Sequence, residues 1–173
     1  MTCEDSVAEA LAAFLRTRRE EISHLVERAE QLGTALQVRS PEHVLCHADI
    51  HGRNVLIGAN DALHIVDWDT LIFAPKERDL MFICGGVGGI WNNAREEELF
   101  YQGYGQAEIN PVALVYYRYE RIVEDIAAFC EQLLLSAEGG TYREVSLRKL
   151  VDAFQPNNVV EIAHASDTLL RAG

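Results

Sequence analysis

The spacing of apolar residues along the chain predicts a mostly helical protein. From Val7 to Leu32 apolar side chains recur three or four positions apart, which is typical of one face of a long amphipathic helix. Gly33 follows as its expected C-terminal cap. The same spacing predicts five more helices, the third of them with Pro111 in its first turn. They cover residues 78–84, 92–101, 112–133, 141–154 and 158–170.

One segment departs from the helical pattern. Short apolar runs at 44–46, 55–57 and 63–66 are separated by a polar loop and by the turn Gly58-Ala59-Asn60-Asp61. Two apolar runs that flank such a turn are typical of a β-hairpin. We therefore expect a mainly α (α+β) fold, in which a single domain over residues 1–173 carries one small hairpin.

Composition narrows the classes of function. The net charge of −12 repels nucleic acid and anionic membrane surfaces, and it favours a cationic ligand. No apolar run is long enough to span a membrane, and the four cysteines form no CxxC pair that would suggest zinc or a disulfide framework. The polar, acidic start of the chain does not resemble a signal peptide, so a cytoplasmic location is expected.

The residues that could take part in catalysis or metal binding lie next to the predicted hairpin. Asp49 and Asn54 lie in the polar loop, and the hairpin returns Asp67 towards that loop. Carboxylate and amide oxygens suit Mg²⁺, which takes few protein ligands and completes its shell with phosphate and water. Phosphoryl transfer needs such a metal and a carboxylate that orients the attacking hydroxyl. The three residues together therefore indicate magnesium-dependent phosphoryl transfer.

A second interpretation of the same loop is a transition-metal site. His47, Asp49 and His51 alternate along an extended segment, so their side chains could face one ion, as in a metal-dependent hydrolase. This interpretation leaves Asn54 and Asp67 without a role.

The loop and hairpin also resemble a known family. The spacing H-x-D-x-x-x-x-N over 47–54, then a strand, a turn and a strand that leads into Ile65-Val66-Asp67-Trp68, matches a kinase catalytic loop and metal-binding Asp. With His51, it resembles the aminoglycoside phosphotransferase family, which has choline- and homoserine-kinase-like relatives. Pro75, Arg78-Asp79-Leu80 and the stretch 117–125 are most similar to its spectinomycin phosphotransferase branch. The resemblance covers most of the chain.

The resemblance implies a fold and a set of site residues. The fold would be a protein-kinase-like C-terminal lobe. Asp49 would be the catalytic base or hydroxyl-orienting residue. Asn54 and Asp67 would bind Mg²⁺ and, through it, the phosphates of ATP.

It also implies supporting roles around these three. His47 would be structural, bonding the loop backbone and supporting the metal-binding segment. Asp79 would brace the catalytic loop from the next helix. The role of His51 stays open, and Asp69 is a weaker candidate for a supporting contact.

The acceptor is expected to be small and possibly cationic. Acidic residues on the later helices would pair with its ammonium groups, or they are ordinary solvent-facing residues paired along their own helix with Arg118 and Arg121. These candidates are Glu96, Glu97, Glu98, Glu120, Glu124 and Asp125.

The nucleotide-clamping lobe of a complete kinase-like enzyme is not recognisable. The sequence contains no G-x-G-x-x-G, and its two lysines, Lys76 and Lys149, follow the catalytic loop. We therefore expect that lobe to be absent and the chain to be inactive alone. The expected function is the catalytic lobe of an ATP- and Mg²⁺-dependent phosphotransferase acting on a hydroxyl of an aminoglycoside or aminocyclitol. The alternative is a non-catalytic binding or scaffold module. Surface left uncovered would favour a homodimer.

Overall fold

The computed structural model describes residues 6–38, 41–87, 94–135 and 141–172. Its helices are α1 (Ser6–Thr17), α2 (Arg19–Val38), α3 (Glu77–Leu80), α4 (Ala94–Tyr104), α5 (Pro111–Leu135), α6 (Thr141–Ala153) and α7 (Val159–Ala172). Its strands are β1 (His43–Cys46), β2 (Val55–Ile57), β3 (Leu63–Ile65) and β4 (Ile72–Pro75). Short 3₁₀ turns, η1 (Gly52–Asn54), η2 (Ala59–Asp61) and η3 (Trp68–Thr70), lie between them.

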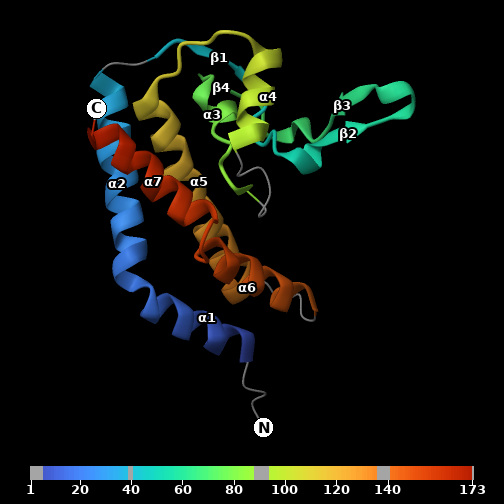
Figure 1. The fold of residues 1–173 in the computed structure, drawn as a ribbon. Helices are drawn as coiled ribbons and strands as arrows, with labels where there is room; N and C mark the ends of the chain where they lie inside the picture. Colours follow the sequence, from blue (N-terminus) through green and yellow to red (C-terminus); the bar gives the residue numbers. More distant parts are fainter. Residues whose placement is uncertain (1–5, 39–40, 88–93, 136–140, 173) are drawn as a thin grey trace.

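Helix α5 is the centre of the molecule. It contacts α1, α2, α3, α6 and α7, and in Figure 1 it runs alongside α2 and α7. Apolar residues three or four apart on α5 face this core, so the amphipathic pattern of the sequence decides which side is buried. The fully or nearly buried members of this core include Leu11, Leu25, Val115, Tyr119, Ile122, Leu133, Leu150 and Val160.

The single long helix predicted over 7–32 is two helices. Backbone hydrogen bonds continue through Arg18, whose N–H donates to Phe14 O, but the axis bends there, as Figure 1 shows. The bend lets α1 reach α6 while α2 follows α5. Gly33 is not a cap: it lies inside α2, where an added Cβ would stand 3.0 Å from Cε2 of Tyr116. The missing side chain lets α2 and α5 approach closely.

The predicted hairpin is present, and a second small sheet accompanies it. Strands β2 and β3 pair antiparallel with Ile57 opposite Leu63, and the hairpin extends away from the helices in Figure 1. Strand β4, which the sequence did not predict, pairs antiparallel with β1 and places Leu45 opposite Phe73. Beneath this sheet a second buried cluster joins β1 and β4 to α3 and α5; it contains Cys46, Ala74, Met81, Phe82, Ala113 and Tyr117.

The remaining predicted helices are close to those observed, with one exception. The helix predicted over 78–84 ends at Leu80, and turns follow to Cys84, whose φ of 53° is left-handed. The helix predicted over 92–101 begins at Ala94 among the described residues, and its first two positions lie outside them. Within the described ranges, none of the helices combines the length and apolarity that crossing a bilayer requires.

Candidate active site

The catalytic-loop segment begins where β1 ends, and Asp79 holds its first turn. The backbone N–H groups of His47 and Ala48 donate to the two carboxylate oxygens of Asp79, at 2.9 and 2.7 Å. Ala48 is left-handed, with φ at 66°, so the chain turns sharply here and cannot use strand hydrogen bonds. The expected brace by Asp79 is confirmed.

His47 joins the loop to the end of the hairpin. Its Nε2 lies 2.9 Å from Val66 O, and its Nδ1 accepts the N–H of Asp49 at 3.3 Å. The Trp68 ring packs 4.7 Å from the imidazole, centroid to centroid. His47 is therefore structural, as expected.

The same contacts exclude the transition-metal interpretation. Both ring nitrogens of His47 are already engaged, so His47 cannot join Asp49 and His51 around an ion. Over the described ranges, no group of three or more His, Cys, Asp and Glu residues is arranged to hold a metal. The structure therefore gives no support to the alternative interpretation of a hydrolase-type cluster.

Asn54 is buried against Asp49. Its Nδ2 donates to the backbone O of Asp49 at 2.9 Å and approaches Asp49 Oδ2 at 3.3 Å. Because the side-chain nitrogen of Asn54 faces Asp49, the side-chain oxygen of Asn54 points away from Asp49. The backbone O of Asn54 accepts the N–H of Val66 at 3.0 Å, which ties the loop to the segment that carries Asp67.

Asp67 follows directly after these contacts. It has left-handed dihedral angles, φ 66° and ψ 59°, at the N-terminal end of η3, and its side chain is exposed. A non-glycine residue in this region is uncommon, and such residues cluster at functional sites. Asp49, Asn54 and Asp67 thus lie on segments joined by direct hydrogen bonds. Asp69 is exposed in η3, and its supporting role stays a prediction.

An arginine that the sequence analysis did not place here contacts the catalytic loop. Arg121 Nη1, on α5, donates to Asp49 Oδ1 at 2.7 Å, and Arg121 Nε donates to Asp125 Oδ1 at 3.0 Å. Burial disfavours its charge, but the carboxylates of Asp125 and Asp49 outweigh this and raise the pKa of Arg121. The i,i+4 spacing of Arg121 and Asp125 was visible in the sequence; the contact with Asp49 was not.

His51 lies on the other side of the Asp49 carboxylate. Its Nε2 is 3.7 Å from Asp49 Oδ2, and its ring meets Phe82 edge-on at 6.2 Å. Its Nδ1 is buried and has no hydrogen-bond partner among the described residues. The ring therefore borders Asp49 without being fixed by a hydrogen bond at that nitrogen.

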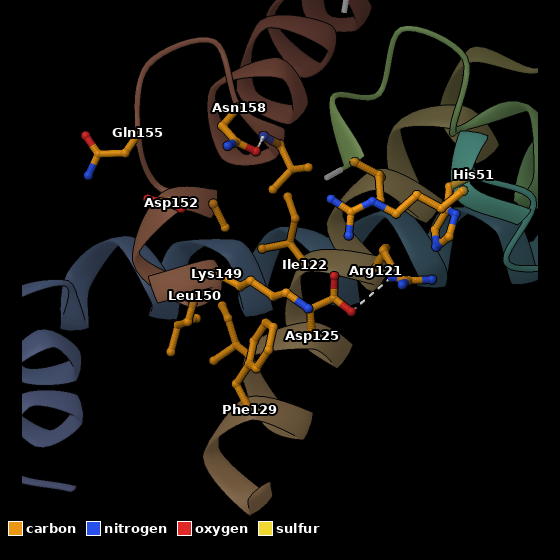
Figure 2. A pocket seen from close by; sticks show the side chains of 15 residues that line it. His51, Arg121, Ile122, Asp125, Phe129, Lys149, Leu150, Asp152, Gln155 and Asn158 are labelled. Atoms are coloured by element: carbon orange, nitrogen blue, oxygen red, sulfur yellow. Dashed lines mark hydrogen bonds and ion pairs between the residues drawn. The ribbon is translucent and has the colours of Figure 1, made fainter. Parts of the chain in front are cut away.

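A cavity of about 480 Å³ opens beside this group, between the end of the loop and helices α5, α6 and α7 (Figure 2). Such a volume suits a small ligand. Its charged and titratable lining consists of His51, Arg53, Arg121, Asp125, Lys149 and Asp152, and its apolar wall includes Ile122, Ile126, Phe129, Leu150 and Val159. Asp49 is not part of the lining, but two of its neighbours, His51 and Arg121, are.

The six acidic candidates, all within the described residues, divide clearly. Asp125 lines the cavity, and burial raises the pKa of its carboxyl although Arg121 lowers it in part. Glu120 and Glu124 pair with Arg78, at 3.4 and 3.3 Å, and not with the expected Arg118 and Arg121 of their own helix. Glu120 also accepts a hydrogen bond from the hydroxyl of Tyr116 at 2.7 Å. The carboxylates of α4 do not line the cavity; Glu98 pairs with Arg95 on its own helix.

Comparison with known proteins identifies the family of the chain. The chain belongs to the phosphotransferase enzyme family, whose family model matches residues 3–118. It is similar to the crystal structure of spectinomycin phosphotransferase APH(9)-Ia in complex with ADP and spectinomycin, with a TM-score of 0.85 and 42% identity, covering 96% of this chain and 51% of that one. For the AMP-bound complex of the same enzyme the TM-score is 0.83 and the sequence identity 43%, and the match covers 95% of this chain and 51% of that one.

The predicted fold and family are thereby confirmed. The mostly helical chain has the kinase-like fold of these phosphotransferases, as expected for their C-terminal lobe, and the spectinomycin branch was the right one. The chain spans about half the length of the solved relatives it matches. No curated protein sequence matches it significantly.

Proposed function

We propose that the chain is the catalytic lobe of an ATP- and Mg²⁺-dependent phosphotransferase that acts on a hydroxyl of a small molecule. The observation that carries this proposal is the Asp49 carboxylate, held by Asn54 and Arg121 beside a ligand-sized cavity. A carboxylate fixed at such a site can accept the hydrogen bond of an acceptor hydroxyl and take its proton during transfer. The family assignment supports the same chemistry.

The oxygen ligands present fit Mg²⁺. The amide nitrogen of Asn54 is engaged with Asp49, which leaves its oxygen available, and the Asp67 carboxylate is exposed on the adjoining segment. One amide and one carboxylate oxygen are a typical protein share of a magnesium shell. When bound, the ion would neutralise charge on the phosphates. Asn54 and Asp67 would hold the ion, and Asp49 would orient the acceptor hydroxyl.

The proposed acceptor is an aminoglycoside or aminocyclitol, with spectinomycin as the first compound to test. One solved relative is a complex with ADP and spectinomycin, and both relatives carry adenine nucleotides. Asp125 and Asp152 in the cavity can pair with ammonium groups of such an acceptor. Transfer to spectinomycin would confer resistance to that antibiotic. A cytoplasmic location stays a prediction of the sequence.

Split-enzyme complementation tests the proposal. The chain is mixed with the half of APH(9)-Ia that it does not span, and transfer of labelled phosphate from ATP to spectinomycin is followed with and without Mg²⁺. We expect transfer in the mixture, none from the chain alone, and none with Asp49→Ala. Choline and a neutral sugar serve as competing acceptors.

A non-catalytic binding or scaffold module is the second candidate. The observation in its favour is the cavity of about 480 Å³ beside the loop, which could hold a small ligand without phosphoryl transfer. Spectinomycin binding by the chain, measured by calorimetry, with no Asp49-dependent transfer in the complemented mixture would favour this module. Transfer that survives Asp49→Ala would refute the catalytic assignment of Asp49.

A further inference from the structure

We propose that Arg121 is the positioning residue for Asp49. Arg121 fixes the Asp49 carboxylate in the catalytic loop and connects that carboxylate to Asp125, which lines the cavity. This inference rests on the proposed function, because the orientation of Asp49 matters only if Asp49 acts on an acceptor.

The contacts use two different edges of the Arg121 guanidinium. Nη1 donates to Asp49 Oδ1 at 2.7 Å, and Nε donates to Asp125 Oδ1 at 3.0 Å. The guanidinium is planar and its donors have fixed directions, so the position of one carboxylate constrains the other. Helix α5, which contacts most of the other helices, carries both Arg121 and Asp125. The anchor of Asp49 is therefore a rigid element rather than a loop.

Without Arg121 the orientation of Asp49 would be weakly determined. The χ2 rotation of an aspartate is broad. The remaining side-chain contacts of the carboxylate are Asn54 Nδ2 at 3.3 Å and His51 Nε2 at 3.7 Å, both at Oδ2. Arg121 holds Oδ1, so both oxygens are fixed while each keeps a lone pair for a hydroxyl. Small displacements of a group that orients a reactant are costly, which makes this contact functionally important.

The chain contains a matched arginine for comparison. Arg78 also bridges two carboxylates, those of Glu120 and Glu124, and lies 5.6 Å from the centroid of the Tyr117 ring. Arg121 lies 5.7 Å from the centroid of the Phe82 ring. Both guanidiniums are mostly buried, with side chains 12% and 21% exposed for Arg78 and Arg121. Of the two arginines only Arg121 contacts Asp49, so Arg78→Met, on α3, controls for loss of a guanidinium that pairs with carboxylates of α5.

The first measurement is an NMR signature that needs no catalysis. In the full chain labelled with ¹⁵N-arginine, the Nε–Hε signal of Arg121 is assigned by its loss in Arg121→Lys. We expect Asp49→Asn to shift this signal and to speed rotation of the guanidinium group. Arg78→Met should leave it in place. An Arg121 signal that is unchanged in Asp49→Asn would refute the pairing.

The second measurement is spectinomycin affinity by calorimetry. Arg121→Met should weaken binding about tenfold, as for loss of one charge-assisted contact. Arg121→Lys should restore only part of it, because an ammonium is a point charge that cannot serve both carboxylates from separate edges. Arg78→Met should bind as the wild type does.

The outcomes separate this inference from the proposed function. Full recovery in Arg121→Lys, or wild-type affinity in Arg121→Met, would show that orientation by the guanidinium is unimportant and would overturn the inference. If the wild-type chain binds no spectinomycin, the acceptor assignment fails, and the NMR signature decides the pairing of Arg121 with Asp49. Melting temperatures of all variants check folding; if Arg121→Met unfolds, Arg121→Lys carries the test.

Discussion

Replacing Asp79 by alanine should destabilise the protein by about 3 kcal/mol, because it removes both acceptors that hold the start of the catalytic loop. The N–H groups of His47 and Ala48 donate to Asp79 at 2.9 and 2.7 Å, and both residues are almost fully buried. A buried donor left without a partner costs about 1–3 kcal/mol. In Asp79→Asn one oxygen remains, so we expect about half of that loss.

Urea unfolding followed by tryptophan fluorescence and by far-ultraviolet circular dichroism measures this effect. Trp68 packs on His47 and so reports on the loop, whereas the dichroism signal reports on the helices. A loss of 3 kcal/mol corresponds to a melting temperature lower by about 6–12 °C in a chain of this size. The control is Asp61→Asn in the exposed turn of the hairpin, which should stay within about 0.5 kcal/mol. If Asp79→Ala loses less than about 1 kcal/mol, water replaces Asp79 and the brace is not needed.

Three further predictions concern other parts of the molecule. Leu45 and Phe73, opposite each other on β1 and β4, are 59% and 71% exposed. Because exposed apolar side chains favour association, we expect a dimer in light scattering at high concentration, and a monomer for Phe73→Glu. A monomeric wild type would contradict this prediction. Gly86→Ala should cost about 2 kcal/mol in urea unfolding, because φ is +71° and the new Cβ would lie 2.5 Å from a side-chain carbon of α7; Gly103→Ala, with open space around it, should not destabilise. Burial and a nearby histidine lower the pKa of His164, so the unfolded state binds more protons below about pH 6.5. Acidification from pH 7 to pH 5 should therefore destabilise the wild type more than His164→Gln, and an equal loss in both would refute the assignment.

Local signals in the sequence predicted much of the fold. The 3.6-residue period located the later helices to within a few residues, since burial of one helix face requires that period. The turn at Gly58–Asp61 located the hairpin for a similar reason, because few residue types reverse a chain so tightly. The bend at Arg18 and the extension of α2 past Gly33 were missed. Both follow from which helix each segment packs against, and no local period records that.

For the site, the sequence by itself determined the residues that the loop spacing and the resemblance select: Asp49, Asn54 and Asp67, with the supports His47 and Asp79. The two supports were confirmed by the hydrogen bonds of the loop backbone to Asp79 on α3 and by the contact of His47 with Val66 O at the end of the hairpin. The catalytic and metal-binding roles of the other three stay proposals. A motif can encode these positions because a few strands and turns bring them together.

Only the tertiary structure decided the surroundings of Asp49. Arg121 is 72 positions away and reaches Asp49 because α5 packs against the buried cluster under β1 and β4. Strand β4 forms because its partner β1 lies next to it. The acidic residues of α5 likewise divide between Arg78 and the cavity through packing rather than through their spacing. Periodicity assigns a side chain to a face, whereas its partner across that face depends on how whole helices and strands pack.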